Sequence, residues 1–281
     1  MSERRAFVVG HPIAHSRSPL IHGHWLAELG IAGRYERVDV APDAFPAFLR
    51  GLAERGYVGG NVTLPHKEAA FRAADRATEA AARLGAANTV WLGPGGEIVG
   101  HNTDGAGFLA SLDAALGPTW DAEVATALVL GAGGAARAVA AALVERGLAR
   151  VLVSNRTETR ARDLIALAPD RMSVLPWADR ALALGEVDLL VNATQLGMTG
   201  QGALDLPLDA LGSRAMVSDL VYVPLETALL ADARRRGLRV ADGLGMLLHQ
   251  AAPGFEAWFG VRPEVTPALR ALVEADIGGR R

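Results

Sequence analysis

The sequence contains no cysteine and only one lysine, Lys67. The absence of cysteine excludes disulfides, thiolate nucleophiles and cysteine-ligated zinc or iron–sulfur sites. All other basic side chains among the 28 lysine and arginine residues are arginines. Arginine cannot release its proton in a protein, whereas lysine can when its surroundings lower its pKa. Lys67 is therefore a candidate for acid–base chemistry, and the alternative is an ordinary solvated lysine.

Strong charge and long apolar runs are also missing. A net charge of −3 with mixed signs argues against nucleic acid or an anionic membrane as the main partner and favours a small solute. The apolar run Ala6–Val9 is too short for a signal-peptide core, and Val124–Ala136 is interrupted by glycines, which excludes a membrane span. We expect a cytoplasmic protein, either a monomer or a homodimer.

The pattern of apolar residues alternates strands with helices, which is typical of an α/β protein. Predicted strands cover residues 5–10, 35–40, 58–63, 86–91, 124–130, 150–154, 188–193 and 216–222, with a hairpin turn at 93–96. Predicted helices cover residues 18–29, 43–55, 78–84, 134–146, 224–236 and 263–275, and further helices begin at 65, 104 and 243.

Lys67 follows a predicted strand and lies in a turn that leads into a helix. Pro65 is predicted as the first helical residue, which puts Lys67 beside the positive end of the helix dipole, where an ammonium loses its proton more easily. Asp104 lies in the first turn of a later helix, and Asn88 lies at a strand end. A carboxylate next to Lys67 would orient the amine and oppose the dipole, so the net pKa of Lys67 stays open.

The segment from His11 to Pro19 offers a candidate anion site. Ser16 and Ser18 precede a helix, and Ser18 is predicted to be its N-cap, followed by proline at the first helical position. Hydroxyls and backbone amides at a helix N-terminus suit a carboxylate, although capping alone explains Ser18 equally well. We expect no metal, because no acidic residue completes a set with the nearby histidines at 11, 15, 22 and 24.

The strand ending at Leu130 leads into a glycine-rich turn and an alanine-rich helix, the context of a dinucleotide turn. Gly131 would make the tight turn, Gly133 would let the backbone approach a pyrophosphate, and Ala136 would let helix pack on strand. The next strand ends in Asn155-Arg156-Thr157, where an NAD site usually has an acidic residue. With Arg160 and Arg162 close behind, this segment favours NADP.

The arrangement of these segments predicts two domains. Residues 1–105 with 246–281 are expected to form an N-terminal α/β domain that binds the substrate and carries the catalytic groups. Residues 106–245 are expected to form a Rossmann-type, doubly wound NADP domain, and the C-terminal helices are expected to return to the first domain.

Taken together, these motifs make the chain resemble the shikimate dehydrogenases over nearly its full length. The motifs that carry the resemblance are Ser16-Arg17-Ser18-Pro19, Asn61-Val62-Thr63-Leu64-Pro65-His66-Lys67, Gly85-Ala86-Ala87-Asn88-Thr89, Asn102-Thr103-Asp104, Gly131–Ala136, Asn155-Arg156-Thr157, Asn192-Ala193-Thr194, Asp219–Pro224 and Gly245–Gln250. Their order and joint presence are far more specific than any single motif.

The resemblance implies a role for each matching residue. Lys67 and Asp104 would form the catalytic pair. Substrate binding would involve Ser16 and Ser18 at the carboxylate, Asn61, Thr63, Asn88, Asp104 and Gln250 at the ring hydroxyls, and Tyr222 nearby. NADP would be held by Gly131, Gly133, Gly134, Ala135, Asn155, Arg156, Thr157, Arg160, Thr194, Leu220 and Gly243.

The implied reaction is the reversible reduction of 3-dehydroshikimate to shikimate by NADPH, a step of the shikimate pathway towards chorismate and the aromatic amino acids. Two alternatives stay open: a quinate/shikimate dehydrogenase that uses NAD, and a non-catalytic NADP-binding sensor. The presence of both Lys67 and Asp104 weighs against the sensor. Paired serines at 16 and 18 favour shikimate over quinate.

Overall fold

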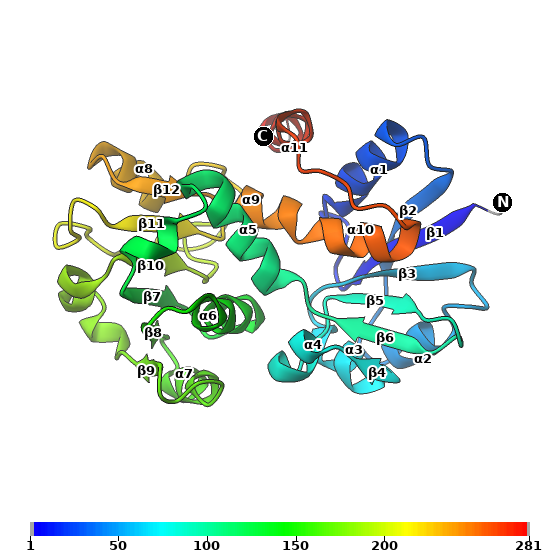
Figure 1. The fold of residues 1–281 in the computed structure, drawn as a ribbon, viewed down its shortest axis with the longest axis horizontal. Helices are drawn as coiled ribbons and strands as arrows, with labels where there is room; N and C mark the ends of the chain where they lie inside the picture. Colours follow the sequence, from blue (N-terminus) through cyan, green and yellow to red (C-terminus); the bar gives the residue numbers. More distant parts are fainter. Residues whose placement is uncertain (1–2, 280–281) are drawn as a thin grey trace. The chain divides into compact units, whose positions relative to one another are not determined.

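The computed structural model describes residues 3–279, which form two compact α/β units (Figure 1). The first unit comprises the residues through Thr103 together with Gln250–Asp276, and the second comprises Asp104–His249 with the residues from Ile277. Each unit is built on one six-stranded sheet. The predicted fold class, two α/β domains with the C-terminal helices returning to the first, is confirmed.

The sheet of the first unit has the strand order β2-β1-β3-β5-β6-β4. Only β5 runs against its neighbours, because β5 and β6 form the predicted hairpin. The strands are β1 (Arg4–Gly10), β2 (Gly33–Asp39), β3 (Tyr57–Val62), β4 (Arg76–Ala77), β5 (Thr89–Leu92) and β6 (Ile98–His101). The helices are α1 (Ser18–Glu28), α2 (Phe45–Arg50), α3 (Lys67–Ala73), α4 (Glu79–Leu84), α10 (Ala251–Phe259) and α11 (Pro267–Gly279).

The directions of these strands bring polar residues to one edge of the sheet. The carboxyl ends of β1, β3 and β6 lie there, together with the amino end of the antiparallel β5. Strand register places Asn61 opposite Thr89, and Thr89 opposite His101. Segments that are far apart in sequence therefore meet at this edge.

The C-terminal helices complete the first unit. The indole Nε1 of Trp258 in α10 donates to Val90 O at 2.9 Å, and that of Trp25 in α1 donates to Glu264 O at 2.9 Å. Gly59 makes this packing possible, because a Cβ there would lie 2.5 Å from Trp258 Nε1. Helix α10 is thus fixed on the sheet, with Gln250 directly before it.

The sheet of the second unit is entirely parallel, with the order β12-β11-β10-β7-β8-β9. This is the doubly wound Rossmann order, whose switch point lies between β7 and β10. The strands are β7 (Thr126–Leu130), β8 (Arg150–Ser154), β9 (Met172–Val174), β10 (Leu189–Asn192), β11 (Met216–Asp219) and β12 (Arg239–Ala241). The helices are α5 (Asp104–Leu116), α6 (Gly134–Arg146), α7 (Glu158–Ile165), α8 (Ala228–Arg235) and α9 (Gly243–His249), with short 3-10 turns at Trp120–Glu123, Trp177–Asp179 and Leu182–Glu186.

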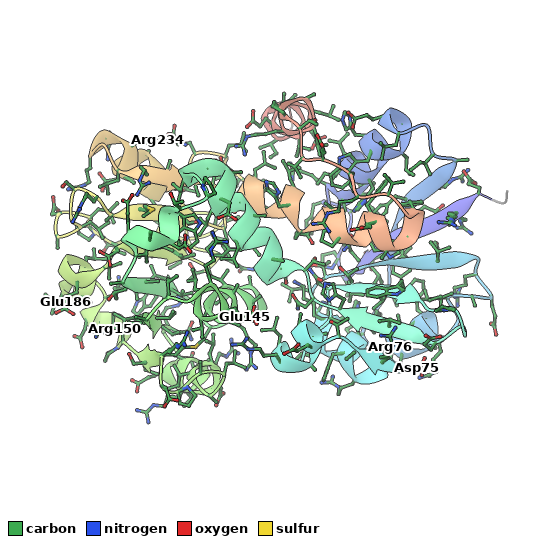
Figure 2. The ribbon with its side chains drawn as sticks, in the orientation of Figure 1. Asp75, Arg76, Glu145, Arg150, Glu186 and Arg234 are labelled. Carbon is green, nitrogen blue, oxygen red and sulfur yellow. The ribbon has the colours of Figure 1, made fainter. Side chains whose placement is uncertain are left out.

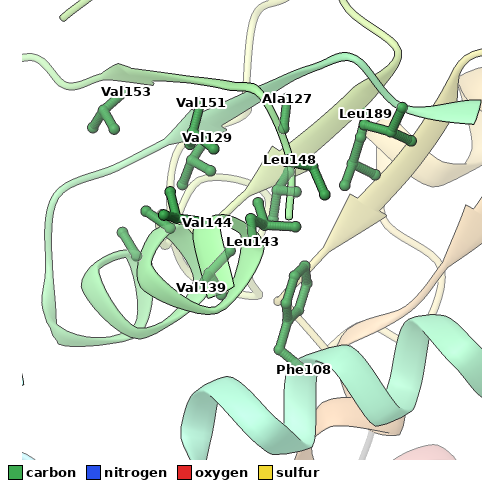
Figure 3. Close-up of a cluster of buried hydrophobic side chains, with 14 of the residues drawn as sticks. Phe108, Ala127, Val129, Val139, Leu143, Val144, Leu148, Val151, Val153 and Leu189 are labelled. Atoms are coloured by element: carbon green, nitrogen blue, oxygen red, sulfur yellow. The ribbon is translucent and has the colours of Figure 1, made fainter. Parts of the chain in front are cut away.

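Aliphatic side chains fill the space between this sheet and its helices. Figure 3 shows Val139 and Leu143 of α6 directed at the strands that carry Val129 and Val151, with Phe108 of α5 beside them. Burying one side chain of this kind contributes about 1.5–3 kcal/mol. By contrast, the exposed pair Arg150–Glu186, labelled in Figure 2, has its charged atoms 3.3 Å apart and contributes about 1 kcal/mol at most. The core therefore dominates the stability of this unit.

Several helix boundaries differ from the prediction. The helix predicted at 43–55 ends at Arg50, because Gly51 caps it and turns follow. The helix predicted from Pro224 begins at Ala228, where the Thr227 hydroxyl accepts from the Leu230 N–H. The helix from Gly243 is divided at Gln250 into α9 and α10, and the last helix starts at Pro267 instead of 263.

One strand is also shorter than predicted. The strand expected to reach Tyr222 ends at Asp219, whose carboxylate accepts from the Val221 N–H at 3.0 Å and so turns the chain. In the part of the chain that the structure describes, no helix is both long and apolar enough to cross a membrane.

Candidate active site

Helix α1 begins beside the two predicted serines, but Ser18 is not its N-cap. The cap position is Arg17, and Ser18 is the first helical residue. The Ser16 hydroxyl, not that of Ser18, accepts from the Ser18 N–H at 3.3 Å, which is why the prediction was wrong. The two hydroxyl oxygens are 3.3 Å apart. They form a pair of hydroxyls at the N-terminus of an 11-residue helix, an arrangement that suits an anion.

Two arginines hold this serine pair in place. Arg37 on β2 donates from Nε and Nη2 to the carbonyl oxygen of Ser16, at 2.9 and 2.6 Å. Arg17 is buried, and its Nε lies 3.1 Å from Asp276 Oδ2 in α11. The loop is therefore anchored to both the sheet and the C-terminal helix.

Asparagines 61 and 88 belong to one buried hydrogen-bond network. Asn61 donates from Nδ2 to Asn88 O at 3.3 Å and to the Thr89 hydroxyl at 3.2 Å. Asn88 Oδ1 accepts from the Thr103 N–H at 2.9 Å, and its Nδ2 donates to the Thr103 hydroxyl at 2.9 Å. Gln250 joins through its Oε1, 3.4 Å from Asn88 Nδ2. We call Asn61, Asn88, Thr89, Thr103 and Gln250 the amide network.

Lys67 is the first residue of α3, because this helix starts two positions later than the predicted start at Pro65. Its carbonyl oxygen accepts from the Ala87 N–H at 2.9 Å, which ties it to the residue before Asn88. The preceding residue, His66, is buried, stacks on Phe45 with centroids 4.4 Å apart, and donates from Nε2 to Val40 O at 2.8 Å. Burial lowers the pKa of His66, so the ring stays neutral. The backbone of Lys67 is thus fixed beside the amide network.

Thr63 and Asp104 complete the residues expected around the substrate. Thr63 follows β3, and its N–H donates to Val9 O at 2.9 Å, which places it at the same sheet edge. Asp104 is the first residue of α5, as predicted, and only 6% of it is exposed. It directly follows Thr103, a member of the amide network. A carboxylate at a helix N-terminus is stabilised by the helix dipole.

In the second unit, the glycine turn joins β7 to α6 as predicted. Gly131 has φ +112°, and a Cβ there would lie 2.9 Å from Ala193 O, so only glycine fits. Its N–H donates to Ser154 O at 2.8 Å, which docks the turn on the end of β8. Gly133 and Gly134 are exposed, and a Cβ at either would meet no atom within 4 Å. The turn therefore presents open backbone at a helix N-terminus.

The end of β8 carries the residues expected to select the nucleotide. Asn155 donates from Nδ2 to Thr157 O at 2.8 Å, which orders the loop before α7. Arg156 and Arg160 are exposed, and Arg160 lies in the first turn of α7. The acidic residue of this segment, Glu158, is paired with Arg162. No unpaired carboxylate among residues 155–160 would therefore repel a phosphate.

The buried carboxylate of Asp219 joins the ends of β10 and β11. It accepts from Asn192 Nδ2 at 2.9 Å, the Val221 N–H at 3.0 Å and the Thr227 hydroxyl at 2.7 Å. Asn192 Oδ1 in turn accepts from the Thr194 hydroxyl at 2.7 Å. We call Asp219, Asn192, Thr194 and Thr227 the carboxylate network. Burial raises the pKa of Asp219, because no cation lies among its partners to offset the lost hydration.

Leu220 and Gly243 lie next to this network. The Leu220 N–H donates to Asn192 O at 2.9 Å, and a Cβ on Gly243 would clash with the Leu220 carbonyl. Tyr222 is half-buried in the loop that follows β11. Most of the expected residues thus lie at or directly after the strand ends of the two sheets, in two groups.

Sequence reasoning missed Tyr35, Thr89, Thr103 and Asp219 as members of these groups. The Tyr35 hydroxyl donates to Asn61 Oδ1 at 2.6 Å. Thr89 and Thr103 each follow an asparagine that was identified, and this adjacency was the available signal. Among residues 3–279, no cluster of three or more His, Asp or Glu side chains could hold a metal ion.

Three family descriptions match this chain. Residues 8–90 match the shikimate dehydrogenase substrate binding domain, residues 115–198 match shikimate / quinate 5-dehydrogenase, and residues 243–273 match the shikimate 5′-dehydrogenase C-terminal domain. A protein of Methylobacterium radiotolerans named shikimate dehydrogenase (NADP(+)) is 62% identical over 98% of both chains. One of the same name from Methylocella silvestris is 59% identical over 97% of this chain and 96% of its own.

Solved structures agree with these relatives. Shikimate 5-dehydrogenase from Thermus thermophilus, in complex with NADP(H) and shikimate, is 40% identical with a TM-score of 0.84, covering 98% of this chain and 99% of that one. Quinate dehydrogenase from Corynebacterium glutamicum, in complex with NAD, is 30% identical with a TM-score of 0.90, covering 97% and 99%. Both the sequence identity and the fold extend over almost the whole length, and the chain belongs to the shikimate dehydrogenase family.

Proposed function

We propose that this protein is an NADP-dependent shikimate dehydrogenase that interconverts 3-dehydroshikimate and shikimate. The observation that carries the proposal is the position of the only lysine, because the backbone of Lys67 is fixed beside the buried amide network. The chain also matches a shikimate dehydrogenase over 98% of its length. NADPH, when bound, supplies the hydride for the carbonyl carbon.

The substrate groups match the polar groups of the first unit. The hydroxyls of Ser16 and Ser18, at the N-terminus of α1, would hold the carboxylate. Asn61, Thr63, Asn88 and Gln250 would bind the ring hydroxyls, since amide and hydroxyl groups can both donate and accept. By its resemblance to the family, Tyr222 would also contribute to substrate binding.

Lys67 and Asp104 would carry the proton chemistry. As the carbonyl is reduced, negative charge grows on its oxygen, and the Lys67 ammonium would stabilise this charge and donate a proton. In the reverse direction the neutral amine accepts the hydroxyl proton. We assign Asp104 as the carboxylate that orients the amine.

The residues of the second unit fit NADP. Exposed backbone at Gly133 and Gly134, between the buried Gly131 and the half-buried Ala135, suits a pyrophosphate at the N-terminus of α6, and these four residues would hold it. Arg156 and Arg160, with Asn155 and Thr157, would hold the 2′-phosphate, since Glu158 is neutralised by Arg162. Thr194, Leu220 and Gly243 would border the remainder of the cofactor.

One assay tests the proposal. The purified protein is supplied with shikimate or quinate, each with NADP or NAD, and reduction of the cofactor is followed by absorbance. We expect the highest kcat/KM with shikimate and NADP. A preference for quinate with NAD would identify a quinate dehydrogenase, and no turnover with any pair would contradict a dehydrogenase function.

We further propose that the enzyme is cytoplasmic and acts as a monomer or a homodimer. The lack of cysteine is compatible with a reducing compartment. Light scattering coupled to size-exclusion chromatography would measure the mass directly, and a mass above that of a dimer would contradict this assignment.

A further inference from the structure

We propose that Tyr35 is a positioning residue that fixes the Asn61 side chain as an acceptor for a substrate hydroxyl, and thereby sets the affinity for shikimate. The inference rests on the proposed function. Tyr35 is assigned no contact with substrate or cofactor and acts through Asn61.

The Tyr35 hydroxyl is hydrogen-bonded to a residue that is assigned to the substrate. It donates its only proton to Asn61 Oδ1 at 2.6 Å. Burial raises the pKa of Tyr35 well above its ordinary value of 10.0, so the phenol remains a neutral donor.

The hydrogen bond from Tyr35 also fits a single orientation of the Asn61 amide. Asn61 Nδ2 faces the Asn88 carbonyl and the Thr89 hydroxyl, where a donor is required. Its Oδ1 must then face Tyr35, which supplies the matching donor. Both N–H groups of Asn61 are used within the protein, so the side chain can only accept from a ligand. Asn61 is therefore held as an acceptor for a substrate hydroxyl.

Aromatic packing fixes where the hydroxyl of Tyr35 lies. Its ring stacks on His22, with centroids 4.0 Å apart and planes 16° apart. His22 in turn lies nearly parallel to Phe255 of α10, at 5.9 Å. His22 is completely buried, and burial lowers its pKa to about 3, so the stack does not change charge near neutral pH. The stack therefore holds the Tyr35 ring rigidly.

Tyr57 provides a matched control on the same sheet. Tyr35 and Tyr57 are each 8% exposed. The Tyr57 hydroxyl also donates to a side-chain oxygen, Glu36 Oε2, at 2.9 Å. Glu36 pairs with Arg5 and is not among the residues assigned to the substrate. Removing the Tyr35 hydroxyl costs its buried hydrogen bond to Asn61, and removing the Tyr57 hydroxyl costs its partly buried bonds to Glu36 and Arg5. Only Tyr35 contacts a residue that is assigned to the substrate.

The experiment compares Tyr35→Phe with Tyr57→Phe in the full chain, with shikimate and NADP as substrates. We expect Tyr35→Phe to raise KM for shikimate about tenfold, the effect of one lost hydrogen bond and one unpaired acceptor, while KM for NADP changes less than about twofold. Tyr57→Phe should lower Tm about as much as Tyr35→Phe does, and should leave the KM values for shikimate and NADP unchanged. An unchanged KM for shikimate in Tyr35→Phe, or equal rises in both variants, would overturn the inference.

A double-mutant cycle tests whether Tyr35 acts through Asn61. In an Asn61→Ala background, the effect of Tyr35→Phe on KM should shrink to less than about threefold, because the side chain that Tyr35 positions is already gone. A full tenfold effect in that background would contradict the proposed route. Turnover by the unaltered protein separates the two hypotheses: an inactive parent contradicts the proposed function, whereas an active parent with an unaffected Tyr35→Phe variant contradicts only this inference.

Discussion

The two units order their strand-end loops with different polar chemistry. The amide network of the first unit consists of amides and hydroxyls, without a buried charge among its members, and each group both donates and accepts. The carboxylate network of the second unit is centred on Asp219, which only accepts from the groups around it. One network suits direct recognition of a polyhydroxylated ring, and the other suits fixing backbone loops.

The difference fits the role proposed for each network, substrate recognition in the first unit and cofactor binding in the second. Substrate hydroxyls need partners that can reverse donor and acceptor roles, which amides and hydroxyls provide. A nucleotide bound by backbone N–H groups needs loops held at fixed positions, and a buried carboxylate that accepts hydrogen bonds from several segments does this well. The following variants test that division, from the largest expected effect to the smallest.

Lys67→Ala should leave both networks intact and remove the proton chemistry. We expect kcat to fall about 10³-fold, within the range for loss of a general acid, while the Kd values for shikimate and NADP change by less than about threefold. Steady-state kinetics and isothermal titration measure the two quantities. A large loss of affinity with little loss of kcat would assign Lys67 to binding.

Asn88→Asp places a buried carboxylate, the central group of the second unit's network, in the amide network of the first unit. A carboxylate at this position, where only 3% of the residue is exposed, could no longer donate to Thr103 and would face the Gln250 oxygen. We expect kcat/KM for shikimate to fall about 100-fold, roughly the cost of a buried unpaired charge, with the Kd for NADP unchanged within about twofold. Equal losses for both ligands would indicate general damage to the fold.

Asp219→Asn is the reciprocal change. An amide offers one acceptor where three donors converge, so the loops after β10 and β11 should loosen. We expect KM for NADP to rise roughly 5- to 10-fold and KM for shikimate to change less than about twofold. A variant with selective loss of shikimate binding would break the comparison between the two networks.

The same variant tests the raised pKa of Asp219. Because the folded state holds this proton more tightly than the unfolded state, the carboxyl contributes most stability at low pH, and the contribution falls as pH rises above its ordinary pKa of 3.8. The free energy of unfolding of the parent should therefore decrease relative to that of Asp219→Asn from about pH 4, near the ordinary pKa, to about pH 7. Urea titrations at both pH values measure it, and a difference independent of pH would argue against the raised pKa.

His22→Phe should have the smallest effect. Neither ring nitrogen of His22 has a hydrogen-bond partner of acceptable geometry among the described residues. Phenylalanine keeps a ring in the stack and removes two unpaired buried polar atoms, so we expect Tm to rise by about 3 °C with unchanged kinetics. A lower Tm would mean that the larger ring does not fit beside Tyr35.

Much of this arrangement could be predicted from the sequence because strong local signals mark it. The glycine turn after β7, Gly85 as the C-cap of α4 and the alternating strands all depend on short-range geometry. Lys67 was identifiable because it is the only lysine of the chain. Asn88 and Asp104 were identifiable because they lie at a strand end and in the first turn of a helix.

What could not be predicted depends on contacts between distant segments. Tyr35 occurs in an alternating strand and reads as an ordinary core residue, because its partner Asn61 lies 26 positions away. The strand after residue 216 was predicted too long, since Asp219 diverts the backbone through the Val221 N–H. Ser18 was assigned as a cap because the sequence does not reveal that the Ser16 hydroxyl takes the nearby N–H instead.

The most direct test of the account is the turnover of Lys67→Arg with shikimate and NADP across the pH range of the parent enzyme. Arginine keeps the positive charge at the start of α3 but cannot release a proton. If Lys67 transfers the proton, kcat of Lys67→Arg should be as low as that of Lys67→Ala at every pH. A kcat within about tenfold of the parent would show that charge alone suffices and would contradict the acid–base role of Lys67.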